Sequence, residues 1–163
     1  STKMIARHRR DSLKIITLIL LFILAAGCSK DPTEQEILEK AIEHQRWDEY
    51  DDALASYQLL IKQFPKSPNV PEALYAMGVI YEKKKDFTKA AAAFKRLAEE
   101  HPDHPTASSA AYIRAFLLSS ELKDPDGARK AYEEFLKRYP NALMATSAKA
   151  ELDSLKNIKR KKK

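Results

Sequence analysis

The sequence contains a single cysteine, Cys28, and only three glycines. One thiol cannot form a disulfide within the chain, so the fold must be held together by its core. Scarce glycine, abundant Ala, Leu, Glu and Lys, and little alternation of Val, Ile and Thr favour helices over strands. We therefore predict an all-α fold, in a chain of 163 residues that is long enough for one domain of ordinary size.

The sequence also lacks an apolar run long enough to cross a bilayer. Its longest run, IITLILLFILAA, covers only residues 15–26. As a helix this run would rise about 18 Å, whereas the hydrocarbon core of a bilayer is about 30 Å thick. Basic residues precede the run and small residues follow it, which is the pattern of a signal peptide. We expect residues 1–27 to form a signal peptide that is absent from the mature protein.

A strongly basic folded domain is lacking as well, although the formal net charge is +6. Residues 1–27 carry +4 and the tail 156–163 carries +6, which leaves −4 for the residues between them. This distribution removes the electrostatic argument for nucleic-acid binding. The basic tail could contact anionic lipid head groups or an acidic protein, or it could simply be a solvated helix end.

The signal-like segment ends in LAAGC, whose last residue is Cys28, and this resembles the lipobox of bacterial lipoproteins. The resemblance implies that the Cys28 thiol carries a diacylglyceryl group, that cleavage occurs just before it, and that its new α-amine is acylated. Residues 28–33 would then be a lipidated linker. At about 0.8 kcal/mol per buried methylene, two or three acyl chains would hold the protein firmly on a membrane. An uncleaved signal anchor with an incidental thiol is the alternative.

Ser29 stands where aspartate would resemble the inner-membrane retention signal of enteric bacteria. The resemblance to lipoproteins therefore implies a lipid anchor in the outer membrane, at its periplasmic face. The sequence CSKD at residues 28–31 faintly resembles a surface-export signal, so exposure on the cell surface stays open.

Three segments of the chain repeat at spacings of 37 and 38 residues: DEYDDALASYQLLIKQFP, KDFTKAAAAFKRLAEEHP and KDPDGARKAYEEFLKRYP. Each has an acid at a possible helix start, apolar residues at helical spacing and a final proline. The candidate capping acids are Asp48, Asp86 and Asp124. A residue before proline disfavours the α conformation, so the helices should end at Phe64, His101 and Tyr139.

A second helical pattern precedes each segment, and the resulting helix–turn–helix unit resembles the tetratricopeptide repeat. The consensus residues of that family occur in the middle copy at Leu74, Gly78, Tyr81, Ala90, Phe94 and Pro102. The resemblance implies that the small residues let paired helices approach closely and that the aromatic residue fills the space between them. Over all three copies, the predicted repeat-packing residues are Ala53, Tyr57, Gly78, Ala90, Phe94, Ala128 and Tyr132.

We therefore predict a short α-solenoid of three repeats over residues 34–155. A final helix should cover the apolar edge of the third repeat with Leu143, Ala148, Leu152 and Leu155. The long connections after each proline resemble those of an envelope subgroup, which includes the D lipoprotein of the outer-membrane β-barrel assembly machinery and the coordinator of the Tol-Pal system. The resemblance implies a non-catalytic scaffold for envelope proteins in barrel assembly or, alternatively, in Tol-Pal or cell-wall coordination. An envelope enzyme or ligand-binding protein is the alternative from another class.

In tetratricopeptide repeats, two positions of each first helix line a concave groove. All six equivalents here are apolar: Leu38, Ile42, Tyr75, Val79, Tyr112 and Phe116. Family members that clamp a peptide carboxylate carry Lys and Asn there, so we expect an amphipathic helix or an extended segment of a partner protein instead. The competing interpretation is that these residues only pack against neighbouring first helices.

No nucleophile with a plausible base, no recognisable carboxylate pair and no glycine-rich phosphate loop is evident in the sequence, so we expect neither an enzyme nor a cofactor. His101, Asp103 and His104 offer three metal ligands in four residues, but Pro102 stiffens this loop and no fourth ligand is evident. We expect no metal site. Trp47 should be a packing residue in a turn.

Overall fold

The computed structural model describes residues 31–161 of the chain. The predicted signal peptide and Cys28 lie outside these residues. The compact body begins at Glu34. No helix within the described part of the chain has the length and apolarity that a bilayer span requires.

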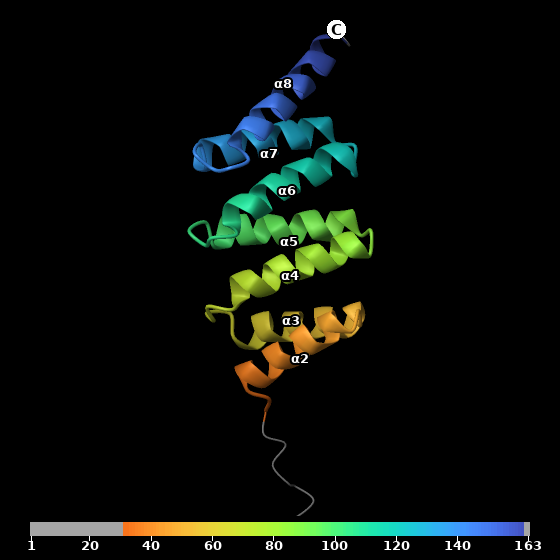
Figure 1. Cartoon of the computed structure of the whole chain (residues 1–163), viewed down its shortest axis with the longest axis vertical. Helices are drawn as coiled ribbons and strands as arrows, with labels where there is room; N and C mark the ends of the chain where they lie inside the picture. Colours follow the sequence, from red (N-terminus) through yellow and green to blue (C-terminus); the bar gives the residue numbers. More distant parts are fainter. Residues whose placement is uncertain (1–30, 162–163) are drawn as a thin grey trace, which may run out of the picture. The chain divides into compact units, whose positions relative to one another are not determined.

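The described residues form seven helices and no strand, which confirms the all-α prediction. The helices are α2 (Glu34–Arg46), α3 (Tyr50–Gln63), α4 (Val70–Lys83), α5 (Phe87–Glu100), α6 (Ala107–Ser120), α7 (Pro125–Arg138) and α8 (Ala145–Lys161). Figure 1 shows antiparallel pairs, α2 with α3, α4 with α5 and α6 with α7, stacked in one row and closed by α8. This is the predicted solenoid of three repeats with a capping helix.

The second helix of each repeat ends where its proline predicts. Phe64, His101 and Tyr139 are the C-terminal caps of α3, α5 and α7. At the other end, Asp86 accepts a hydrogen bond from the backbone N–H of Lys89, and Asp124 accepts one from Gly127. These side chains satisfy amide groups that the first turn of a helix leaves free.

The prediction that Asp48 caps α3 is wrong by one residue. The cap is Glu49, which makes no side-chain capping bond, because its carboxylate contacts the Nδ1 atom of His44 at 2.6 Å. Asp48 instead adopts a left-handed backbone conformation with φ of 59°. Lys85 and Lys123, at the equivalent places in the other repeats, are also left-handed, with φ of 59° and 53°. Asp tolerates this conformation better than most residues.

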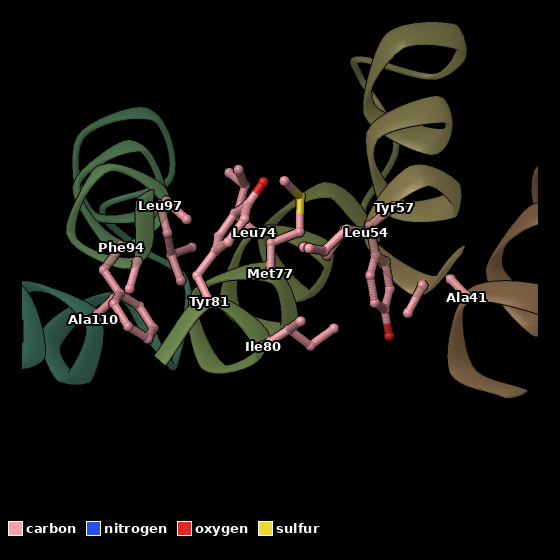
Figure 2. Packing of buried hydrophobic residues seen from close by; sticks show 14 of the residues in the cluster. Ala41, Leu54, Tyr57, Leu74, Met77, Ile80, Tyr81, Phe94, Leu97 and Ala110 are labelled. Carbon is pink, nitrogen blue, oxygen red and sulfur yellow. The ribbon is translucent and has the colours of Figure 1, made fainter. Parts of the chain in front are cut away.

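The core runs along the stack in two clusters that meet at α6. The first extends from α2 to α6 and includes Tyr57, Leu74 and Leu97, which Figure 2 shows among their neighbours. The second joins α6, α7 and α8 around Tyr132 and Phe135. Each repeat buries its apolar face only against its neighbours, as solenoids do.

Helices α4 and α5 pack tightly against each other at Gly78. A Cβ atom on Gly78 would lie 2.6 Å from two ring carbons of Phe94, which is far inside contact distance. Phe94 is fully buried. The ring therefore occupies the volume that any other residue at position 78 would need. The outer repeats carry Ala41 and Ala115 at the equivalent place, both fully buried.

The final helix α8 covers the third repeat with Ala148, Leu152 and Leu155, all buried. Its opposite face is polar, because Lys149 and Asp153 stand where α4 has its consensus Leu and Gly. The prediction that Leu143 belongs to this cover is wrong, since 91% of its surface is exposed. The reason is that α8 begins only at Ala145, so Leu143 lies in the preceding loop. The helix also continues past residue 155, so the predicted start of the basic tail falls inside it.

The hydroxyl of Tyr132 is buried without a hydrogen-bond partner among the described residues, and burial raises the pKa of Tyr132 well above its usual value. A buried polar group that lacks a partner destabilises the fold. Tyr132→Phe should therefore raise the free energy of unfolding by about 1 kcal/mol, which chemical denaturation can measure. The middle repeat already has phenylalanine, Phe94, at this position.

Tyr57→Phe is the matched control in the first repeat. The Tyr57 hydroxyl donates a hydrogen bond of 2.7 Å to Oε1 of Gln45, so its removal should be neutral or destabilising. If both variants changed stability in the same direction, the unsatisfied Tyr132 hydroxyl would not be the cause.

Candidate binding groove

A hollow of about 690 Å³ lies between α2 and α4, the first helices of the first two repeats. Four predicted groove residues line it: Leu38, Ile42, Tyr75 and Val79. Leu38 and Ile42 are one helical turn apart, and so are Tyr75 and Val79, so each helix contributes a stripe of two side chains. Ala41, buried beside Ile42, faces the core of the repeat instead.

The walls of the hollow are held by the core behind them. The Tyr75 ring packs edge-on against Phe94, with ring centroids 5.6 Å apart. Tyr57 of α3 also lines the hollow, and its hydroxyl is bonded to Gln45. By contrast, Ile42 is 45% exposed, so its apolar side chain is accessible to a ligand. The hollow is therefore a preformed, mainly apolar surface.

The two ends of the hollow carry opposite charges. Arg46 lines it at the C-terminal end of α2, whereas Glu72 lines it near the start of α4. Both helices run across the stack from left to right in Figure 1, so Arg46 at the end of α2 and Glu72 near the start of α4 lie at opposite ends of the hollow. A bound segment would therefore bury apolar side chains in the middle and meet charge at each end.

Asn69 at the anionic end is fixed by other polar groups. Its side-chain amide donates a hydrogen bond of 2.7 Å to Oε1 of Glu34, which also accepts one from the Ser67 hydroxyl. These hydrogen bonds, from Ser67 first and then Asn69, lower the pKa of the Glu34 carboxyl. The carboxylate thus links the start of α2 to the loop between α3 and α4.

The other two predicted groove residues lie outside this hollow. The Tyr112 ring is partly buried and packs edge-on against Tyr132 and Phe135, with centroid distances of 5.9 and 5.8 Å, at the border of the core of the third repeat. Phe116 on α6 is 44% exposed and does not line the hollow. Sequence reasoning missed Gln45, Arg46, Asn69 and Glu72. A search one helical turn beyond the two consensus groove positions would have found Gln45 and Arg46.

The histidine loop after α5 has structural contacts of its own. Nδ1 of His104 lies 2.9 Å from the Thr106 hydroxyl, and Nε2 lies 3.5 Å from a carboxylate oxygen of Glu72. Elsewhere in the described residues, His44, Glu49 and Asp52 approach one another closely, with both acids exposed.

The prediction that Trp47 is a packing residue is wrong, because 69% of its surface is exposed. Helix α2 ends at Arg46, and the turn that follows carries the indole away from the core.

Comparison with known proteins places these observations in a family. The family model described as YfiO, outer membrane lipoprotein, matches residues 30–160. The outer membrane protein assembly factor BamD of Neisseria gonorrhoeae is 26% identical over 147 residues, which cover 80% of this chain and 55% of that protein. BamD of Xylella fastidiosa is 24% identical over 169 residues, covering 88% of this chain and 58% of that protein. The chain thus spans about half the length of the curated relatives it matches.

Solved structures show the same fold. The first tetratricopeptide domain of Spaghetti (RPAP3), bound to an HSP90 peptide, superposes with a TM-score of 0.54 at 21% identity, covering 77% of this chain and 91% of that chain. The TPR2B domain of yeast Sti1, in a complex with pHsp70, gives 0.55 at 15% identity, covering 76% and 96%. At such identities the likeness establishes the tetratricopeptide fold alone.

Proposed function

This chain belongs to the YfiO family of outer membrane lipoproteins, and we propose that it is a non-catalytic scaffold that holds partner proteins at the outer membrane during outer-membrane protein assembly. The family match over most of the chain and the named role of the BamD relatives support this proposal. The preformed apolar hollow between α2 and α4 supports a role in binding proteins.

Attachment to the membrane is the first part of the proposal. Residues 1–27 direct export and are removed, and Cys28 then carries the acyl chains that anchor the protein in the outer membrane. The linker 28–33 connects this anchor to α2 on the periplasmic side. The lipobox-like LAAGC sequence supports this part of the proposal.

Recognition of a partner is the second part. The hollow receives an apolar segment of an envelope protein, either an amphipathic helix or an extended strand, and binding is driven by burial of the side chains of Ile42, Val79 and their neighbours. The accessibility of Ile42 within a largely apolar lining is the observation that carries this part.

Ile42→Glu tests this binding mode directly. Ligand binding would force the new carboxylate out of water against apolar side chains, so partner recovery should fall at least roughly tenfold, a loss of about 1.4 kcal/mol or more. The measurement is crosslinking and affinity purification of the processed protein from its own membranes. Because Ile42 is partly exposed, the thermal midpoint should change little.

Leu59→Glu is the matched control, since Leu59 is 36% exposed on α3 and does not line the hollow. This variant should keep its partners. Equal losses in both variants would contradict binding in the hollow.

The identity of the recovered proteins tests the proposed role. Recovery of barrel assembly components would support a role in outer-membrane protein assembly, whereas recovery of Tol or peptidoglycan-associated proteins would indicate a coordinating role instead. Recovery of no protein partner would contradict the scaffold.

A further inference from the structure

One edge of the stack gathers all the loops between repeats. The loops after α3, α5 and α7 lie on the left of Figure 1, whereas the turns within repeats lie on the right. We call the left side, formed by residues 64–69, 101–106 and 139–144, the loop edge. Helix α2 also begins at this edge, because the first helix of every repeat starts there.

A contact fixes the start of α2 to the loop edge. The Glu34 carboxylate accepts hydrogen bonds from Ser67 and Asn69, both in the loop between α3 and α4. Glu34, where the compact body begins, is therefore held at this edge. In the sequence, Cys28 stands six positions before Glu34, and six residues of fully extended chain span at most about 21 Å.

Further contacts extend along the loop edge to the third repeat. Glu72 in the first turn of α4 faces His104 in the next loop, at 3.5 Å. The Tyr139 hydroxyl, at the end of α7, donates a hydrogen bond of 3.1 Å to the backbone carbonyl of Pro102 in that same loop. The loop edge is thus a connected surface from the start of α2 to the loop before α8.

The last loop on this edge differs from the other two in exposing apolar side chains. Leu143 is 91% exposed and Met144 is 38% exposed. At the position of Leu143, the first two loops have Pro68 and Pro105. The exposed side chains of Leu143 and Met144 are adjacent in the sequence and have no role in the core described above.

The sequence around this apolar pair is cationic. Between Glu134 and Glu151 there is no acidic residue, whereas Lys137 and Lys149 are both exposed. Arg138 lies in the same interval and donates a hydrogen bond to the backbone carbonyl of Ala98. An exposed apolar pair within a stretch of sequence that carries only cations matches the chemistry of an anionic phospholipid surface, which offers an apolar interior beneath negative head groups.

We propose that the loop edge faces the membrane that holds the acyl anchor, and that Leu143 and Met144 enter its interface. The inference rests on the proposed lipid anchor at Cys28. An acyl anchor alone is a single point about which the stack can pivot. A second contact in the third repeat fixes the stack lengthwise along the membrane surface, so that the hollow between α2 and α4 is presented at a constant orientation.

The single tryptophan of the chain makes this inference measurable. Trp47 is exposed in the turn after α2, at the edge opposite the loops, so the unaltered protein reports on the far side of the stack. The variant with Trp47→Phe and Leu143→Trp reports on the loop edge. Both full chains are produced in a host that processes lipoproteins and are reconstituted in vesicles of phosphatidylethanolamine and phosphatidylglycerol with brominated acyl chains, which quench nearby indoles.

In these vesicles the emission of the tryptophan at position 143 should fall roughly by half and shift to the blue, while that of Trp47 stays nearly unchanged. Quenching at position 143 should weaken when phosphatidylglycerol is left out. Flotation of both proteins with the vesicles, and equal quenching of the two tryptophans, would overturn the inference while leaving the anchor intact. Failure of both proteins to float would contradict the anchor, and this inference with it.

Discussion

Gly78→Val should lower the free energy of unfolding by roughly 3 kcal/mol, because its side chain would need the volume that the Phe94 ring fills. Replacing a glycine in a helix normally improves helix propensity, by about 0.5 kcal/mol for a β-branched residue. The steric cost is larger than this gain, since the Phe94 ring is fully buried within the core cluster. Urea denaturation of the processed protein measures the effect. Ala92→Val on the exposed face of α5 is the control and should lower stability only by the difference in helix propensity, about 0.5 kcal/mol.

Combining Gly78→Val with Phe94→Ala tests whether the two residues compete for the same volume. Alone, Phe94→Ala should destabilise the chain by about 3–5 kcal/mol through the cavity it leaves. In that background Gly78→Val should be neutral or stabilising, because the new methyl groups enter the vacated volume. Additive losses in the double variant would contradict the packing described for α4 and α5.

This packing also determines the shape of the candidate groove. The Tyr75 ring that lines the hollow rests against Phe94, so loss of the Phe94 ring removes the support of one wall. We expect Phe94→Ala to reduce partner binding even at temperatures where the chain stays folded. Ile42→Glu should act differently, because it alters the lining without disturbing the core.

The repeat architecture could be predicted because the same helix-ending and helix-capping residues recur at equivalent positions in each repeat. Proline after Phe64, His101 and Tyr139 excludes a continued helix, and all three helices end there. The prediction of the capping residue was wrong only in the first repeat, where the cap of α3 is Glu49 and not Asp48. The longer side chain of Glu49 contacts His44 instead of the backbone.

The candidate site was less predictable, because family positions specify a helix face but not what packs against it. Leu38 and Ile42 line the hollow as the pattern indicates. Tyr75 and Tyr112 occupy the same repeat position, and each packs edge-on against the aromatic residue of the helix that follows, Phe94 or Tyr132. Tyr112 also packs against Phe135, and only Tyr75 lines the hollow. The repeat pattern alone does not specify this difference.

The burial of Trp47 and Leu143 could not be predicted from the sequence either. Both are large and apolar, which favours burial in any sequence-based argument. Both lie in connections outside the helices, and burial there depends on the direction in which a loop carries its side chains. No helical periodicity specifies that direction.

Cys28→Ser should have the largest functional effect, since it removes the thiol that the proposed acyl group needs. The hydroxyl of serine is a far weaker nucleophile than a thiolate, so we expect lipidation to fall to background. Without lipidation, cleavage should not occur, and the precursor should keep residues 1–27. Its apolar run is about 18 Å long as a helix and too short to replace the anchor with a normal span. Outer-membrane fractionation should therefore show loss of the variant from its proper membrane.

Metabolic labelling with radioactive palmitate, followed by mass determination, tests the central claim most directly. The account predicts that the wild-type chain is labelled and begins at residue 28, whereas Cys28→Ser is unlabelled and retains the signal segment. A wild-type chain without label, or equal labelling of both proteins, would contradict a scaffold tethered to the membrane through Cys28.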